Sequence, residues 1–349
     1  MKKIIVNKNL IFQDQQPSKI IAEISCNHNG KKDLLIKHIL KAHESGADLI
    51  KIQTYEADDI CLETNNVNFK IKKGIWRGKY LWDLYKKAQT PYEWHKDIFN
   101  LAKKKKINLF STPFSPRAVD FLEEFKVPIY KISSFEITDI NLIKKIAKTR
   151  KPVIISTGMA TEKEIMEAIK IVKKYHNKII LLHCVSGYPT PENEAHLSRM
   201  NLLKKKFKNT MIGLSDHTND IKSSIIASTL GATVIEKHFI LSKKIKSEDN
   251  SFSITPNQLK NLKEKIIKNH RFLGNEKFQI KKSEEKSINF RRSLFAKRNL
   301  KKNQILKKND IISLRPKIGL SANQFENIIG KKIKIGKKKN SPIFKSDFF

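Results

Sequence analysis

Two histidines at the ends of apolar segments are the side chains of this chain best suited to metal chemistry. His217 ends the run Gly-Leu-Ser-Asp-His, and His238 ends the run Val-Ile-Glu-Lys-His. Roughly twenty residues with a helical pattern separate them, and in a repeating strand–helix chain such spacing makes the two strands neighbours. Both imidazoles can then reach one divalent ion and leave most of its coordination sphere open, which suits catalysis. The alternative is a pair of core histidines satisfied by backbone hydrogen bonds.

Polar residues at the ends of the other apolar segments extend this candidate site. They are Glu23, Lys51, Gln53, Lys131, Ser133, Ser134, Glu136, Ser156, Ser186, Tyr188 and Ser215. A lysine buried in a strand is costly unless it meets an anion. Two such lysines, with serines near the same mouth, therefore predict a site for phosphate and carboxylate groups. The alternative is that Lys51 and Lys131 form internal ion pairs with Glu23 and Glu136.

A regular alternation of strand-like and helical segments would position these side chains. The strand-like segments are residues 20–25, 49–55, 108–112, 129–133, 153–157, 179–184, 211–215 and 233–239. The helical patterns are residues 32–45, 92–105, 116–125, 139–148, 162–175, 194–207, 220–230 and 256–272. This order predicts an α/β fold, a closed (β/α)₈ TIM barrel whose chemistry gathers at the carboxyl ends of the strands. A doubly wound open sheet is the alternative, but no Gly-x-Gly-x-x-Gly follows the first strand.

Two further regions stand outside this alternation. The insertion at residues 56–89 is rich in aromatic residues and is expected to form a lid or wall over the barrel mouth, or else a helix packed outside. After the last helix the pattern changes to short strands. We therefore expect a barrel domain at residues 1–273, a linker at 274–290 and a small β-rich domain at 291–349 that docks on a partner.

Composition narrows the possible classes of protein. No apolar run in the 349 residues reaches the ~18 needed to cross a bilayer, and no secretory signal opens the chain. The three cysteines are far apart and form no Cys-x-x-Cys motif, which favours a reducing cytoplasm over disulfides or a zinc ribbon. We expect no membrane partner.

The formal net charge of +36 is the feature most open to misreading. Most of the excess is lysine spread along the whole chain beside abundant isoleucine and asparagine, which is typical of an AT-biased coding sequence. No nucleic-acid-binding motif accompanies it, so we expect no nucleic-acid partner. A polyanion-binding protein remains the distant alternative, and the field would in any case attract an anionic substrate.

Seven ordered motifs together resemble a known family, the sialic acid synthases, over nearly the whole chain. They are Ile-Ala-Glu23 with Asn27-His-Asn-Gly30, Lys51-Ile-Gln-Thr54, Lys131-Ile-Ser-Ser-Phe-Glu136, Ile155-Ser-Thr-Gly-Met159, Tyr188-Pro-Thr-Pro191, Gly213-Leu-Ser-Asp-His-Thr218 and Glu236-Lys-His-Phe239. The tail, with Arg315-Pro316, resembles the antifreeze-like SAF (β-clip) domain of that family. The resemblance implies a transferase that condenses phosphoenolpyruvate with an N-acetylated hexose.

Within the family, the chain looks most like the pseudaminic acid synthase branch. The segments 133–137 and 236–239 and the run Asp249-Asn-Ser-Phe-Ser253 carry this likeness. Ser247 and Glu248 depart from the usual Gly-Pro, and Ser186 stands where neuraminate synthases have an asparagine. The implied sugar is 2,4-diacetamido-2,4,6-trideoxy-L-altrose, which gives pseudaminic acid and phosphate by C–O cleavage. The alternatives are N-acetylneuraminic or legionaminic acid synthesis, or another phosphoenolpyruvate aldolase that acts on a sugar phosphate.

The resemblance also implies roles for individual residues. Catalysis falls to Glu23, as general acid/base or to align water, and to His217 and His238 as ligands of a divalent metal, Mn²⁺ before Mg²⁺ or Co²⁺. The residues implied for phosphoenolpyruvate are Lys51, Lys131, Ser134, Ser156, Ser186 and Ser215. Those implied for the sugar are Gln53, Glu136, Tyr188, Asp249 and Arg315. Arg315 is expected to enter the active site of the neighbouring subunit in a domain-swapped homodimer, and the product to serve flagellin or polysaccharide glycosylation.

Overall fold

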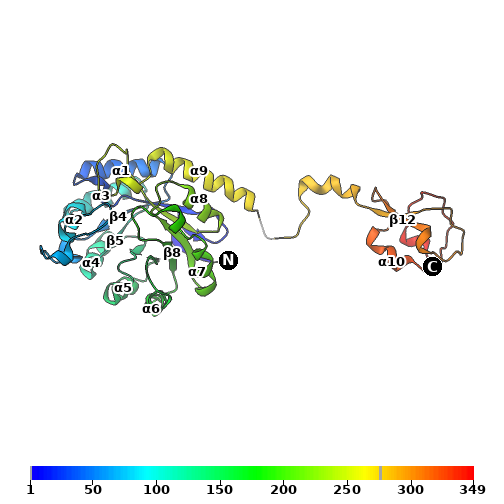
Figure 1. Cartoon of the computed structure of the whole chain (residues 1–349), viewed down its shortest axis with the longest axis horizontal. Coiled ribbons are helices and arrows are strands. Elements are labelled where there is room, and N and C mark those ends of the chain that lie inside the picture. Colours follow the sequence, from blue (N-terminus) through cyan, green and yellow to red (C-terminus); the bar gives the residue numbers. More distant parts are fainter. Residues whose placement is uncertain (1, 275–276) are drawn as a thin grey trace. The chain divides into compact units, whose positions relative to one another are not determined.

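The computed structural model describes residues 2–274 and 277–349, which form two compact units divided after Gly274 (Figure 1). Each unit has its own apolar core. No helix in these described ranges is long and apolar enough to cross a membrane. The predicted linker at 274–290 includes residues 275–276, which lie outside the described ranges, while its later part forms the 3₁₀ helix η6 (Lys282–Phe290).

The first unit is a closed parallel barrel. Among the described residues its strands are β3 (Lys19–Glu23), β4 (Leu49–Thr54), β5 (Leu109–Pro113), β6 (Tyr130–Ile132), β7 (Val153–Ser156), β8 (Ile179–Cys184), β9 (Met211–Asp216) and β10 (Val234–His238), and β10 closes the ring on β3. Figure 1 shows the helices wrapped around this barrel. The predicted (β/α)₈ fold is thereby confirmed.

The surrounding helices follow the predicted segments closely. They are α1 (Lys32–Glu44), α3 (Tyr92–Lys104), α4 (Pro116–Glu124), α5 (Ile140–Lys148), α6 (Glu162–Lys173), α7 (Arg199–Lys206), α8 (Lys222–Thr229) and α9 (Pro256–Leu273). Side-chain caps explain several starts: Ser115, Asp139 and Thr161 each accept a hydrogen bond from the first turn. Helix α7 begins five residues later than the pattern 194–207 predicts, because Glu192–Glu194 forms a separate 3₁₀ turn.

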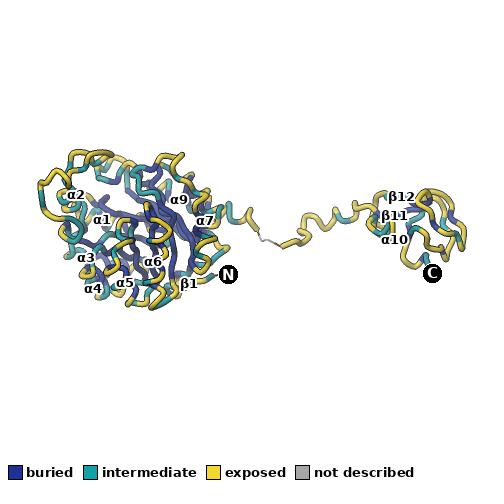
Figure 2. Tube along the Cα trace, turned by 60° about the horizontal axis from the view of Figure 1, so that its bottom comes forward, coloured by how far each residue is buried: buried dark blue, intermediate teal, exposed yellow. Residues whose placement is uncertain are grey.

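Strand alternation divides the barrel side chains into two layers. One set of positions packs outward against the helices, and the other points into the barrel, where an apolar layer includes Ile21, Leu49 and Val234. The strands are the buried centre of the unit and the connecting loops its exposed surface (Figure 2). Two positions further along each strand, toward its carboxyl end, the inward side chain becomes polar.

Sequence analysis missed an antiparallel hairpin before the barrel, β1 (Lys3–Asn7) and β2 (Leu10–Gln13). Its Leu10 and Phe12 are buried in the apolar cluster that fills the barrel interior. The hairpin therefore shields the apolar layer, which lies on the amino-terminal side of the polar one.

The insertion at residues 56–89 holds both a helix and a small hairpin. Helix α2 (Leu81–Ala88) follows an antiparallel bridge between Lys70 and Tyr80. Both parts of the insertion contact the loop between β10 and α9: Lys79 of the hairpin and Lys87 of α2 each pair with Glu248.

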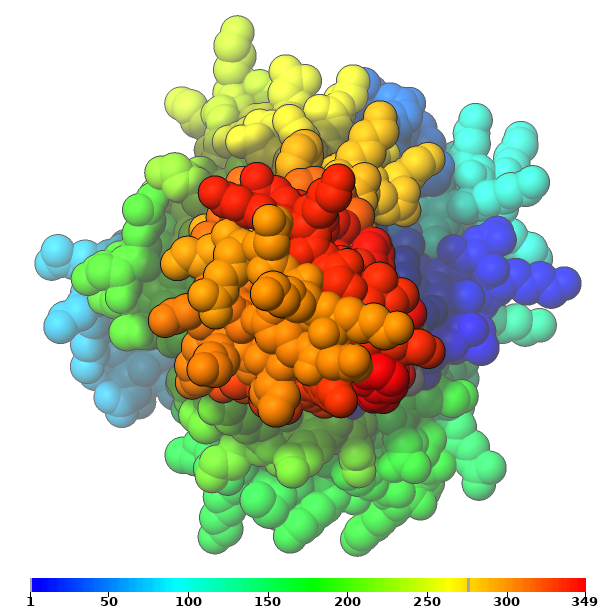
Figure 3. All heavy atoms as spheres, turned by 90° about the vertical axis from the view of Figure 1, so that its right-hand side faces the viewer, coloured from blue at the N-terminus to red at the C-terminus, as the bar shows by residue number. Residues whose placement is uncertain are grey.

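The second unit is a small β-rich domain. Strands β11 (Ser293–Ala296) and β12 (Ile311–Leu314) pair antiparallel, and isolated bridges such as Phe295 to Pro342 join the start of the unit to its end. In Figure 3 these orange and red segments accordingly lie side by side. A separate core forms around Leu294, Ile333 and Ile343. This unit matches the expected β-rich C-terminal domain.

Candidate active site

A ring of inward polar side chains sits at the carboxyl end of the barrel strands, directly beyond the apolar layer. Its members are Glu23, Lys51, Thr112, Lys131, Ser156, Cys184, Ser215 and Glu236. All are buried. Each follows an inward apolar residue or glycine by two positions, as the alternation of a strand requires. Glu23, Lys51, Lys131, Ser156 and Ser215 were predicted for the site, and the fold brings them together.

Two lysines and two carboxylates form the centre of this ring. Lys51 Nζ lies 2.5 Å from Glu23 Oε2 and 3.5 Å from Glu236 Oε2. Lys131 Nζ lies 3.7 Å from Glu236 Oε1, which also accepts a 3.0 Å hydrogen bond from Ser215. The ion-pair alternative is thus half realised, because Lys51 does pair with Glu23, but Lys131 pairs with Glu236 and not with Glu136.

The cluster has shifted pKa values and carboxylate oxygens that lack hydrogen-bond partners among the described residues. Burial alone would raise the pKa of Glu236, but the ammonium groups of Lys131 and Lys51 outweigh it and hold that pKa at about 2. Burial raises the pKa of Glu23, against the pull of Lys51, and lowers the pKa of Lys131. Glu23 Oε1 and Glu236 Oε2 accept no hydrogen bond from the described residues. A buried network with such unused capacity is able to receive a polar ligand.

Serine hydroxyls line the same end of the barrel. The Oγ atoms of Ser156 and Ser186 are buried and have no hydrogen-bond partner among the described residues. Ser134 and Ser186 meet at Gly158, where an added Cβ would overlap Ser186 Oγ and lie 2.7 Å from Ser134 Oγ. The segments that follow β6 and β8 thus bring two hydroxyls against Gly158, where a larger residue would displace them.

The two histidines lie beside each other on neighbouring strands, with ring centres 5.3 Å apart. Imidazoles that share an ion through bonds of ~2.1 Å have ring centres roughly 5 Å apart, so the spacing fits. Nδ1 of His217 is 3.2 Å from the Val185 carbonyl, and Nδ1 of His238 is 3.2 Å from Asp249 Oδ2. Such partners orient metal-binding imidazoles through the nitrogen that does not bind the ion.

The protein could therefore supply two ligands to a metal ion, one from each histidine. Within residues 2–274 and 277–349, no three side chains of His, Cys, Asp or Glu gather into a metal-binding group. The Nε2 atoms of His217 and His238 would hold the ion, and the remaining positions would fall to water or substrate.

The predicted sugar-binding residues of the barrel unit lie around this centre. Tyr188 packs on His217 with ring centres 4.4 Å apart, and Asp249 contacts His238. Gln53 is half-buried on β4 opposite Thr112. Glu136 accepts a hydrogen bond from Ser133, and burial raises its pKa to about 7. Arg315 is exposed in the second unit.

Three members of the ring were not predicted from the sequence: Thr112, which accepts a 3.0 Å hydrogen bond from Lys51, Cys184 and Glu236. Glu236 is the shared partner of both lysines, and Cys184 Sγ lies 3.8 Å from His217 Nδ1. A usable signal did exist for Glu236: it stands two positions before His238, so the alternation that points the histidine inward also points this glutamate inward.

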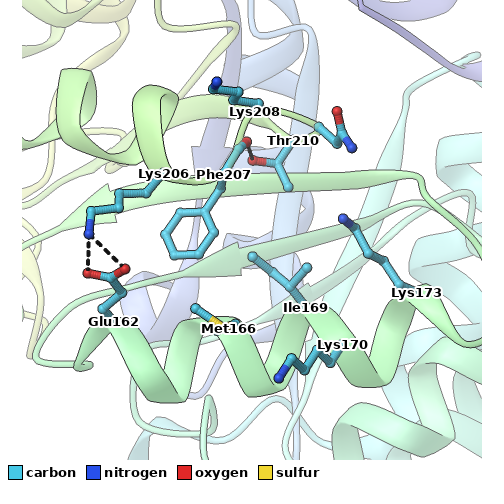
Figure 4. A pocket seen from close by; sticks show the side chains of 10 residues that line it. Glu162, Met166, Ile169, Lys170, Lys173, Lys206, Phe207, Lys208 and Thr210 are labelled. Carbon is cyan, nitrogen blue, oxygen red and sulfur yellow. Dashed lines mark hydrogen bonds and ion pairs between the residues drawn. The ribbon is translucent and has the colours of Figure 1, made fainter.

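A separate pocket on the outside of the barrel is not part of this site. Helix α6 and the connection from α7 to β9 line it with lysines around Met166, Ile169 and Phe207 (Figure 4). Its Lys206 is already paired with Glu162 at 3.0 Å. None of its lining residues was predicted for catalysis or binding.

Comparisons with known proteins agree with this geometry. The NeuB family model matches residues 38–278, and the SAF domain model matches residues 291–348. The chain is 42% identical to the pseudaminic acid synthase of Helicobacter pylori, over 95% of this chain and 98% of that protein. It is 40% identical to the N,N'-diacetyllegionaminic acid synthase of Campylobacter jejuni, over 89% of this chain and 94% of that protein.

A solved structure supports the same assignment. The N-acetylneuraminic acid synthetase of Leptospira borgpetersenii superposes with a TM-score of 0.74 and 32% identity. The match covers 82% of this chain and 95% of that one.

Proposed function

The chain belongs to the NeuB family, and from this premise we propose that it catalyses pseudaminic acid synthesis. Phosphoenolpyruvate, 2,4-diacetamido-2,4,6-trideoxy-L-altrose and water would give pseudaminic acid and phosphate. One observation carries the sugar assignment: relatives named pseudaminic acid synthase are 40–42% identical over 92–95% of the chain. A legionaminic acid synthase at 40% identity over 89% of the chain makes that product the second candidate.

The polar ring supports the reaction on phosphoenolpyruvate. Lys51 and Lys131 would bind its phosphate and carboxylate by charge-assisted hydrogen bonds. When no substrate is bound, the ion pairs with Glu236 would hold both ammonium groups in place. The free hydroxyls of Ser156 and Ser186, with Ser134 and Ser215, would complete this shell. Ammonium groups and hydroxyls that can donate hydrogen bonds suit a substrate made of anionic oxygens.

The bonds change as follows. C3 of the enol attacks the aldehyde carbon of the open-chain sugar, and water adds to C2, so that the phosphate leaves with its bridging oxygen. The water oxygen becomes the C2 carbonyl oxygen and loses two protons in all: one goes to the aldehyde oxygen, which becomes a hydroxyl, and one to the departing phosphate. Glu23 is suited to carry a proton at its carboxylate, because burial raises its pKa and Lys51 holds it in place.

We propose that His217 and His238 hold a divalent ion, Mn²⁺ before Mg²⁺ or Co²⁺. The ion would supply Lewis-acid activation of the sugar aldehyde. Asp249 and the Val185 carbonyl would fix the two ring orientations, and Tyr188 would exclude water from the face of His217.

We also propose that Arg315 of a second copy reaches the sugar in a domain-swapped homodimer, alongside Gln53, Glu136, Tyr188 and Asp249 of the barrel. An exposed arginine on a separate small unit suits contact with another chain. The separated, free cysteines are consistent with reaction in the cytoplasm, where the product would enter surface glycan synthesis such as flagellin glycosylation.

Phosphate release tests the function with three sugars: the trideoxy altrose, the legionaminic acid precursor and N-acetylmannosamine. The first should give the highest kcat/KM, and a preference for either other sugar would overturn the assignment. Chelation should abolish release and Mn²⁺ should restore it, whereas full turnover after stripping would reject the metal.

Mixed dimers test the swapped arginine in the same assay. Two inactive variants, Arg315→Ala and Lys131→Met, should recover up to about a quarter of wild-type activity when co-assembled, since one of the two sites in a mixed dimer is then intact. Complete inactivity of the mixture would reject the swap.

A further inference from the structure

Glu248 is a carboxylate for which the reaction has no use. It lies in the loop between β10 and α9, and its side chain is 14% exposed. Two lysines of the insertion converge on it, Lys79 at 2.5 Å and Lys87 at 2.8 Å. Its backbone carbonyl accepts a 3.2 Å hydrogen bond from the Trp76 indole N–H. A single residue thus binds three groups of the insertion.

The insertion presents Trp76 at the tip of a hairpin. The backbone N–H groups of Ile71 and Gly78 donate at 2.9 Å to the carbonyls of Lys79 and Ile71, respectively. Gly74 and Gly78 turn the tip with φ of +83° and +91°, a left-handed conformation that favours glycine. We call residues 70–80 the tip hairpin. Its backbone hydrogen bonds give the hairpin a defined conformation, and it carries the half-buried side chain of Trp76.

The tip hairpin meets the active site on two sides. The Trp76 ring lies 5.6 Å from that of Tyr188, which packs in turn on His217. On the loop, the neighbour Ser247 donates a 2.5 Å hydrogen bond to Asn27, and the other neighbour, Asp249, contacts His238. Glu248 therefore ties the hairpin to a loop that is itself anchored at the site.

We propose that Glu248 is a positioning residue that latches the tip hairpin over the barrel mouth, so that Trp76 and Tyr188 form an apolar wall of the sugar subsite. This inference rests on the proposed function. The trideoxy diacetamido sugar carries a methyl group at C6 and one on each acetamido group, and aromatic faces favour such apolar contacts. N-acetylmannosamine has hydroxyls at C4 and C6, which this wall leaves without partners.

Glu248 is ionised at neutral pH and can therefore hold the two lysines by ion pairs. Burial would raise the pKa of Glu248, but the hydrogen bonds from Lys79 and Lys87 outweigh it and lower the pKa. The carboxylate is therefore ionised at neutral pH. Because both lysines are substantially exposed, salt weakens the attraction.

Kinetics of Glu248→Gln and Trp76→Ala test the wall. Glu248→Gln should raise KM for the sugar about fivefold while KM for phosphoenolpyruvate stays within about twofold. Trp76→Ala should raise the sugar KM at least as much and reduce the preference for the trideoxy sugar over N-acetylmannosamine.

Salt dependence tests the ion pairs of the latch. High KCl should raise the sugar KM of the wild type but not that of Glu248→Gln. Glu63→Gln, the same change at an exposed carboxylate of the insertion, is the control and should change nothing. Equal rises in both KM values, or none, would overturn the proposal.

Limited proteolysis of the full chain without substrate separates this proposal from the function. Trypsin should cleave after Arg77 about fivefold faster in Glu248→Gln than in the wild type or Glu63→Gln, because the hairpin opens. Unchanged cleavage, with normal turnover of the trideoxy sugar, would reject the latch alone. Faster cleavage in an enzyme that turns over none of the three sugars would reject the proposed function and the wall, but retain the latch.

Discussion

Two buried lysine–carboxylate clusters lie on opposite faces of the barrel wall, and strand β10 contributes to both. The inner cluster joins Lys51 and Lys131 to Glu23 and Glu236. The outer cluster pairs Lys237 Nζ with Asp216 Oδ2 at 3.2 Å, one position along β10 and β9. Both pairs are almost fully excluded from solvent.

The two clusters differ in how completely their hydrogen bonds are satisfied. Asp216 accepts from the backbone and hydroxyl of Thr218 and from the hydroxyls of Ser223 and Ser224, and Lys237 donates to the Thr218 carbonyl. The inner cluster retains carboxylate oxygens and serine hydroxyls without partners. Because unsatisfied buried polar groups are costly, the inner cluster is the one suited to accept a polar ligand. The outer cluster instead holds together the two strand ends that carry the histidines.

The largest effect should come from breaking the inner cluster. We expect Lys131→Met to lower kcat/KM for phosphoenolpyruvate by about 10³-fold, because a charge-assisted contact to an anionic substrate is lost. Folding should survive, since Glu236 keeps Lys51 and Ser215 and burial already disfavours the Lys131 ammonium. Phosphate-release kinetics with circular dichroism check this result. Activity within tenfold of the wild type would mean that Lys131 does not bind the substrate.

Breaking the outer cluster should act on stability. Lys237→Met leaves Asp216 as an unpaired buried charge, and we expect the free energy of unfolding to fall by about 3 kcal/mol. The double variant Asp216→Leu/Lys237→Met should recover part of this loss because no charge remains buried. Urea unfolding of the three proteins measures both effects. If Lys237→Met were as stable as the wild type but as inactive as Lys131→Met, the division between the clusters would be wrong.

A smaller effect concerns Glu136, whose carboxyl at the same mouth has no ion pair among the described residues. Burial raises its pKa to about 7, while the lysines hold that of Glu236 at about 2. A raised carboxyl pKa means that the folded protein binds the proton more tightly, so this stabilisation is present below pH 4.5 and is lost as pH rises to about 7. Glu136→Gln should therefore gain roughly 2 kcal/mol on the wild type between pH 5 and 8. Equal pH profiles of unfolding for the two proteins would contradict this.

The two clusters show which site residues could be identified from the sequence and which could not. Glu23, Lys51, Lys131 and the serines were predictable because each lies at or near the carboxyl end of an apolar segment, and the side chains there that point inward line the mouth of a TIM barrel. The inward direction of Glu236 could be read from its place two positions before His238, but its pairing with Lys51 and Lys131 could not, because these lysines come from strands far away in sequence. The hairpin β1–β2 was missed because it lies outside the strand–helix alternation.

The amino-acid order by itself determined the strands, the helices and the face that each side chain takes, because these depend on local periodicity. Closure of β10 onto β3 decided the rest: it brings Glu236, from the end of the barrel sequence, to Lys51 near its start. The pairing of β10 with β9 sets the distance between His217 and His238, and folding of the insertion brings Lys79 to Glu248. Contacts between distant segments depend on how the strands pair around the whole ring, and only the tertiary structure specifies that pairing.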